Sequence, residues 1–331
     1  MMNRFLINLS AGLVTWLVSI NAWSSSFNTN TAQRPVYRYD FSSWSIPAKV
    51  GGATWFDEHG LYKVDIVASS GWGYADITVN GTPTGTLSPD GATVYKTNNP
   101  GVGIAYQLNH STPSWFSPQY GLVAPNTITL INNIGLNGYM HIKYQLVRLT
   151  DKVPAGRITQ VPDVTLNYHN PAGGSYGDLS FLALSGVSVQ PRSTSCGIDA
   201  PTEIKLPTLY GNTVQNGALN VTAAPTITLT NCPGAINGIS YNFTAVYGPR
   251  DAANGVLNTA TGEGYAQNVY IQVQNADGTP HTINAAIPLS NYDGSGDYPL
   301  PDFKVAYFVD DADSVRAGNV KSAIELNVTY N

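Results

Sequence analysis

The chain has 331 residues, of which only 11% are charged, with 16 Lys and Arg against 21 Asp and Glu. Its formal net charge of -5 leaves no basic surface of the kind that nucleic acid or anionic membranes require, which excludes those partners. Apolar residues make up 43% of the chain, which is enough to build a sizeable core and excludes intrinsic disorder.

The first residues have the features of a secretory signal peptide. Arg4 precedes an apolar run over residues 5–20, and small residues follow at Ala22 and Ser24. We therefore predict a signal peptide over residues 1–24, with export through the periplasm into an oxidising compartment. The alternative is a retained membrane anchor, which is less favoured because the apolar run is short for a membrane span.

Alternation of apolar and polar residues is the clearest signal in the rest of the chain. It recurs over residues 140–146, 219–229 and 269–273, and no window shows sustained helical periodicity. The segment 140–146 is predicted to be a half-buried strand with one wet face, on which Gln145 lies. Gly-containing turns are predicted to separate such strands, at Asn80-Gly81, Asn137-Gly138 and Asp277-Gly278. The fold class is therefore all-β, in the form of β-sandwiches.

The length suggests about two domains. A short polar stretch over residues 190–195 reads as a linker, and every Trp of the chain precedes it. We predict an N-terminal domain over residues 25–190 and a C-terminal domain over residues 191–331.

The N-terminal domain is rich in side chains that bind sugars. Aromatic rings cover the apolar faces of sugars, while Asn and Asp satisfy their hydroxyls. The candidates for receptor binding are Trp55, Asp57, His59, Trp72, Tyr74, Asn98, Asn99, His110 and Trp115. The alternative for each single Trp is that it packs in the sandwich core.

The sequence offers little support for a metal, a cofactor or catalysis. The His residues show neither His-x-His nor His-x3-His spacing, and no catalytic motif occurs, so we predict no metal, no cofactor and no enzyme activity. Two Asp-rich loops at residues 293–297 and 310–313 lack the remaining ligands of a calcium loop and are interpreted as solvated turns.

The only two cysteines, Cys196 and Cys232, both lie in the C-terminal domain. After export, two lone cysteines most simply form one disulfide. A metal site on this pair is the disfavoured alternative, because Asp199 is the only nearby partner.

From Cys196 onward the chain resembles the pilin domain of type 1-like fimbriae, which the bacterial chaperone–usher pathway builds. The resemblance rests on the cysteine spacing, on strands over residues 219–229 and 266–273, and on the ending of residues 318–331 with Tyr330 next to last. It implies an incomplete immunoglobulin-like sandwich that lacks its last strand and leaves an apolar groove. Donor-strand complementation, in which a strand of another chain is added to the sheet, fills such a groove. The residues that the resemblance implies for this groove, and for contact with the chaperone, are Ile324, Leu326, Val328, Tyr330 and Asn331.

A second β domain before a pilin domain resembles the arrangement of a two-domain tip adhesin. The resemblance implies attachment at the fimbrial tip on the cell surface to a host glycan or glycoprotein, without catalysis. The implied partners are a periplasmic chaperone, an outer-membrane usher and the adjacent fimbrial subunit. The alternatives are a structural minor subunit or tip cap without lectin activity, and a secreted carbohydrate-active enzyme.

Overall fold

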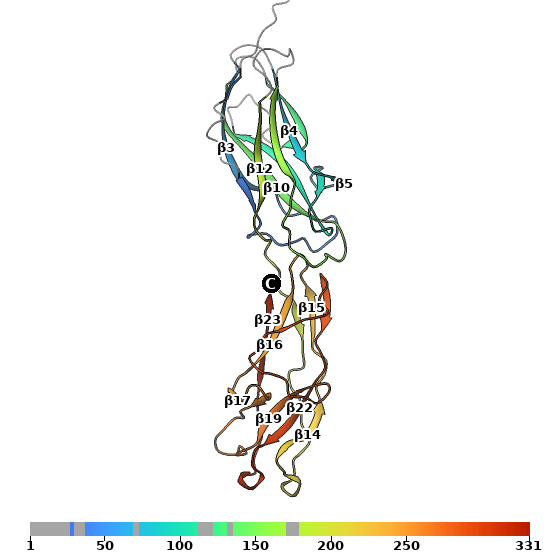
Figure 1. Cartoon of the computed structure of the whole chain (residues 1–331), viewed down its shortest axis with the longest axis vertical. Coiled ribbons are helices and arrows are strands. Elements are labelled where there is room, and N and C mark those ends of the chain that lie inside the picture. Colours follow the sequence, from blue (N-terminus) through green and yellow to red (C-terminus); the bar gives the residue numbers. More distant parts are fainter. Residues whose placement is uncertain (1–26, 30–36, 69–72, 112–121, 131–134, 170–178) are drawn as a thin grey trace, which may run out of the picture.

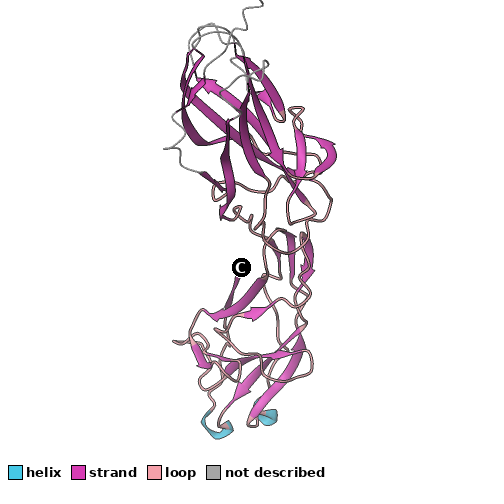
Figure 2. Ribbon diagram, turned by 45° about the horizontal axis from the view of Figure 1, so that its top comes forward, coloured by secondary structure: helices cyan, strands magenta, loops and turns pink. Residues whose placement is uncertain are grey.

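In the computed structural model, the described residues form β-strands, two short 3-10 turns and connecting loops (Figures 1 and 2). It describes residues 27–29, 37–68, 73–111, 122–130, 135–169 and 179–331, and the predicted signal peptide lies outside them. The described ranges contain no α-helix, which confirms the all-β prediction. Within the same ranges, no helix is long and apolar enough to cross a bilayer.

Residues up to 189 form two antiparallel-rich sheets, and we call this part the N-terminal region. One sheet has the order β1-β3-β10-β7-β6-β5 with β8 beside β7, and the other has the order β2-β12-β11-β4-β9. The strands are β1 (Phe27–Thr29), β2 (Tyr37–Asp40), β3 (Asp57–Ala68), β4 (Gly73–Asn80), β5 (Pro83–Leu87), β6 (Thr93–Lys96), β7 (Val102–Ser111), β8 (Leu122–Val123), β9 (Asn126–Leu130), β10 (Gly135–Arg148), β11 (Asp163–His169) and β12 (Leu179–Val189).

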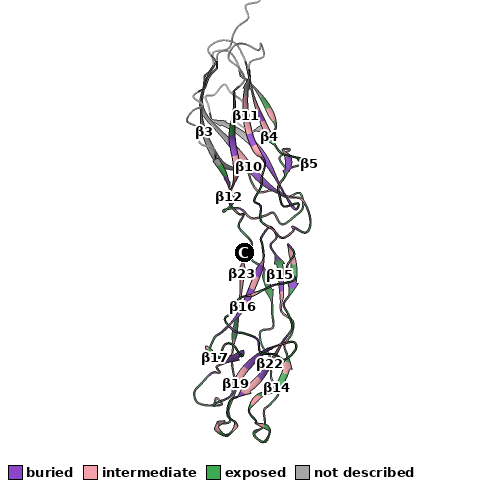
Figure 3. Ribbon diagram, viewed as in Figure 1, coloured by how far each residue is buried: buried purple, intermediate pink, exposed green. Residues whose placement is uncertain are grey.

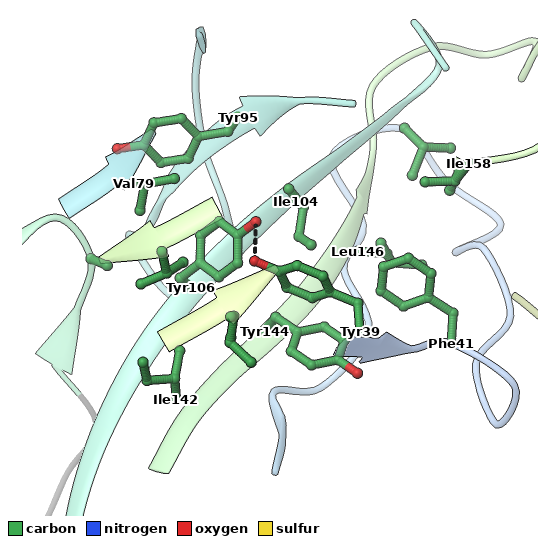
Figure 4. Close-up of a cluster of buried hydrophobic side chains, with 14 of the residues drawn as sticks. Tyr39, Phe41, Val79, Tyr95, Ile104, Tyr106, Ile142, Tyr144, Leu146 and Ile158 are labelled. Atoms are coloured by element: carbon green, nitrogen blue, oxygen red, sulfur yellow. Dashed lines mark hydrogen bonds between the residues drawn. The ribbon is translucent and has the colours of Figure 1, made fainter. Parts of the chain in front are cut away.

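Side chains from both sheets meet in one core, which makes this region a sandwich (Figures 3 and 4). At its centre the hydroxyls of Tyr39 and Tyr106 lie 3.1 Å apart, and both contact the carbonyl oxygen of Pro162, at 2.8 and 3.0 Å. Burial raises the pKa of both phenols, so they stay protonated and remain hydrogen-bond donors. Trp44 also belongs to this core.

Strand β10 contains the predicted segment 140–146, but the face predicted to be exposed to solvent is partly buried. Ile142, Tyr144 and Leu146 are buried as expected, whereas Gln145 is also buried, at 0% exposure. The turn between β5 and β6 explains this difference, because its Asp90 accepts a hydrogen bond from Gln145. The prediction of a solvated Gln145 is therefore wrong, since a hairpin distant in the sequence folds over that face.

Residues from 196 onward form three further sheets, and we call this part the C-terminal region. Their orders are β13-β15-β21, β14-β22-β19-β18-β17 and β20-β16-β23. The strands are β13 (Gly197–Asp199), β14 (Gly217–Ala223), β15 (Thr228–Cys232), β16 (Ile239–Ala245), β17 (Pro249–Asp251), β18 (Val256–Leu257), β19 (Tyr270–Asn275), β20 (Ile287–Pro288), β21 (Gly296–Pro299), β22 (Phe303–Val309) and β23 (Ile324–Tyr330), with 3-10 turns η2 (Gly211–Thr213) and η3 (Ala312–Ser314).

Among the described strands, no sheet combines strands of the two regions, and each region has its own core. The predicted domain limits, with a boundary between residues 190 and 191, remain a prediction.

Two predicted details differ from the structure. Residues 219–229 form parts of two strands, β14 and β15, which belong to different sheets. Pro225 lies in the break, where the missing N–H interrupts strand pairing. Asn137-Gly138 is not a turn, because both residues pair with β3 inside β10. The turn at Asp277-Gly278 is confirmed, and Gly278 has the expected positive φ of 88°.

His281 is buried in the aromatic core of the C-terminal region and should make stability depend on pH. Its ring lies 4.9 Å from the Phe303 ring and its Nδ1 lies 2.8 Å from Asn275 Oδ1, while Nε2 has no partner among the described residues. Burial lowers the pKa of this imidazole. The stability that depends on neutral His281 is therefore present above the unfolded pKa of about 6.5 and is lost as pH falls through the lower folded value.

We expect His281→Phe to flatten the loss of unfolding free energy between about pH 7 and about pH 5.5, measured by denaturant unfolding. Phe fills the same space and cannot take up a proton. An unchanged pH slope in this variant would contradict the assignment.

Candidate functional site

Within the described part of the chain, the last strand, β23, has a strand partner on one edge only. It pairs with β16 from Ile239↔Tyr330 to Ala245↔Ile324, and within the described residues no strand pairs with its other edge. An unpaired edge presents N–H and C=O groups that can pair with another chain. The geometry is therefore compatible with the addition of a strand beside β23.

The apolar face of β23 is only partly covered. Leu326, Val328 and Tyr330 are half-buried against the core of the C-terminal region, and Ile324 is exposed. On the neighbouring strand β16, by contrast, the core-facing residues are fully buried. Part of the apolar surface along β23 is therefore left open to solvent.

The end of β23 is tied to two other segments. The Tyr330 hydroxyl accepts a hydrogen bond of 2.6 Å from the backbone N–H of Cys196, where the first strand of the C-terminal region begins. The Asn331 carbonyl oxygen accepts one of 2.7 Å from the N–H of Asn237. Tyr330 thus bridges the first and last strands of this region.

The predicted disulfide between Cys196 and Cys232 is confirmed. The sulfurs lie 2.10 Å apart, and the bond joins residues 36 apart in the sequence. It fixes the start of β13 to the end of β15. Within the described part of the chain, no group of three His, Cys, Asp or Glu side chains is placed to hold a metal.

The receptor-binding candidates are distributed over the N-terminal region. Trp55 is 83% exposed and lies two residues before the start of β3. The backbone of four further candidates lies on strands β3, β4 and β7; these are Asp57, His59, Tyr74 and His110. Trp72 and Trp115 lie outside the described residues.

Asn98 and Asn99 make hydrogen bonds within the N-terminal region. Asn99 is buried, its Nδ2 donates to the carbonyl oxygens of Pro154 and Gly156, and its Oδ1 accepts from the N–H of Gly101. Asn98 Oδ1 accepts from the N–H groups of Thr159 and Gln160, and its Nδ2 donates to Arg157. Both amides hold the loop after β10. Sequence alone does not distinguish such an amide from one that binds a sugar.

Comparison with protein families identifies the C-terminal region. Residues 184–331 match the family described as "Fimbrial protein". The C-terminal region lies within this match, and we call it the fimbrial domain. The expected resemblance is therefore confirmed for this part of the chain. No curated protein matches the chain.

Several solved structures are similar to the whole chain or to part of it. The CupB6 tip adhesin of Pseudomonas aeruginosa is 17% identical, with 93% of this chain and 94% of that chain covered and a TM-score of 0.41. The CfaE adhesin of enterotoxigenic E. coli is 10% identical, with 90% and 94% covered and a TM-score of 0.34. The receptor binding domain of MrkD1P of Klebsiella pneumoniae is 15% identical, with 53% and 99% covered and a TM-score of 0.29. These TM-scores are low, and no conclusion about this chain follows from them.

The fimbrial domain contacts the N-terminal region through the loop after β10. Val153, buried in the core of the N-terminal region, donates from its N–H to Ser295 Oγ at 2.8 Å and accepts from the N–H of Ser295 at 2.9 Å. Ala235 of the fimbrial domain packs in the same core. The Lys152 ammonium lies 2.5 Å from Asp293 and lowers the pKa of that carboxyl. Residues 293–295 therefore form a docking loop, which corrects their interpretation as solvated turns.

Gly234 gives a direct test of this contact. A Cβ at this position would overlap the carbonyl oxygen of Val153 and lie 2.6 Å from its Cβ. Overpacking of this kind costs about 1–3 kcal/mol. We expect Gly234→Ala to shift the balance toward undocked molecules by about 5- to 150-fold, seen as a larger maximum dimension in solution scattering.

Gly238→Ala is the matched control, because a Cβ at Gly238 meets nothing within 4 Å and neither glycine has a positive φ. If the two variants scatter identically, the contact does not hold the regions together.

Proposed function

We propose that this protein is a two-domain fimbrial tip adhesin. Residues 25–190 bind a glycan on the host surface, and residues 191–331 join the protein to the pilus. The observation that supports this most strongly is a second sandwich, with its own core, before the fimbrial domain. A subunit that only extends a fibre needs the fimbrial domain alone, so the additional sandwich calls for a separate task.

Assembly into the pilus occurs by donor-strand complementation in this proposal. The free edge of β23 and its partly exposed apolar face support it. A periplasmic chaperone occupies this groove first, and after passage through the outer-membrane usher the N-terminal extension of the adjacent subunit fills it. In this proposal the groove accepts one strand, from the adjacent subunit. The protein lies at the end of the fibre because it donates no strand to a further subunit.

Deletion of the protein in its fimbriated host separates adhesion from assembly. Attachment to host cells is counted, fimbriae are counted by electron microscopy, and the protein is located by immunogold labelling. Loss of attachment with unchanged fimbriae, and label at the fibre ends, is the expected result. Loss of the fimbriae themselves would favour a structural subunit or cap, and unchanged attachment would refute the adhesin.

A further inference from the structure

Trp55 is the most exposed large apolar side chain in the described part of the chain, at 83%. Trp55 lies outside the strands, but the residue before it is hydrogen-bonded to β10. The preceding Thr54 donates from its N–H to Leu146 at 2.9 Å, and its hydroxyl accepts from the N–H of Leu146 at 2.9 Å. Trp55 therefore presents a large indole surface from a segment that is bonded to β10 at the preceding residue, where stacking a ligand loses less conformational freedom than on an unbonded loop.

A carboxylate is anchored near the backbone that carries Trp55. Gln145 Nε2 donates to the carbonyl oxygen of Thr54 at 3.0 Å and to Asp90 Oδ2 at 3.0 Å. The same amide nitrogen thus fixes the residue before Trp55 and the side chain of Asp90. Asp90 itself is exposed to solvent, so its other oxygen is free to accept from a ligand.

The burial of Gln145 indicates that this arrangement serves a purpose other than packing. It is fully buried on β10 beside Val147, which belongs to an apolar cluster with Ala92, Val94 and Ala105. Its Oε1 has no hydrogen-bond partner among the described residues. An amide in such surroundings is less stable than an apolar side chain of similar size. We therefore infer that this amide contributes by holding Asp90 and Thr54 in position.

We propose that Trp55 and Asp90 form a saccharide-binding site on the flank of the N-terminal region, with Gln145 as its positioning residue. The site rests on the proposed adhesin function and deepens it. The apolar C–H face of a sugar ring stacks on the indole, while hydroxyls donate to the Asp90 carboxylate. Because that carboxylate repels an anionic ligand, the site takes neutral sugars in preference to sialylated ones.

The test applies the mature full-length chain to an array of neutral and sialylated mammalian oligosaccharides. We expect binding to neutral sugars, and Trp55→Ala and Asp90→Asn should each weaken it by at least about tenfold. Leu87→Ala is the matched control, since Leu87 is also apolar and 65% exposed and belongs to the same hairpin as Asp90. Gln145→Leu should weaken binding while leaving the unfolding transition intact or raised.

The outcomes separate the site from the function. If the wild-type chain binds sugars and Trp55→Ala binds equally well, the site is wrong and the lectin function stands. If only sialylated sugars bind, the assignment of Asp90 is wrong. If the folded chain binds no sugar, the glycan receptor and this site both fail.

Discussion

Replacement of both cysteines, Cys196→Ala with Cys232→Ala, is expected to lower the free energy of unfolding of the fimbrial domain by about 3–4 kcal/mol. The disulfide closes a loop between residues 36 apart and fixes the start of β13 to β15. Without it the N–H of Cys196 is also less well placed to donate to Tyr330, so the first and last strands separate more easily.

The chain supplies its own internal control for this experiment. Every Trp precedes residue 116, so Trp fluorescence reports unfolding of the N-terminal region alone. Circular dichroism at far-ultraviolet wavelengths reports both regions. We expect the cysteine variant to shift the circular-dichroism transition of the C-terminal region to lower denaturant concentration. The fluorescence transition of the N-terminal region should stay nearly in place. A loss below about 1 kcal/mol would show that the disulfide is not what stabilises this domain.

Under the proposed donor-strand complementation, a charge on the open face of β23 is expected to reduce incorporation into fimbriae strongly. Ile324 is 37% exposed, so Ile324→Asp costs the isolated domain little. In the complemented domain the new carboxylate is buried against the added strand without a partner, at a penalty of several kcal/mol. The amount of protein that co-purifies with the chaperone or the adjacent subunit should fall at least about tenfold.

Thr329→Asp is the control for that experiment, because Thr329 lies on the same strand and is exposed. Formation of the Cys196–Cys232 disulfide, followed on non-reducing gels, verifies that both variants fold. Equal incorporation of the two variants would show that the apolar face of β23 does not receive a strand.

Agreement between sequence and structure is greatest where a signal is local. The alternation over residues 140–146 lies within β10, and the Asp-Gly pair at 277 and 278 forms a turn. Agreement ends where a distant segment decides the outcome. Asn98 and Asn99 resemble sugar-binding amides, yet they hold the loop after β10.

The sequence by itself determined the strand-rich composition, the pairing of the only two cysteines and the fimbrial character of the C-terminal region, because each depends on residue type or short-range order. Only the tertiary structure decided that Gln145 is buried beneath a hairpin turn and that residues 293–295 dock on Val153. Both contacts join segments more than 50 residues apart, and residue type does not specify which segments the fold brings together.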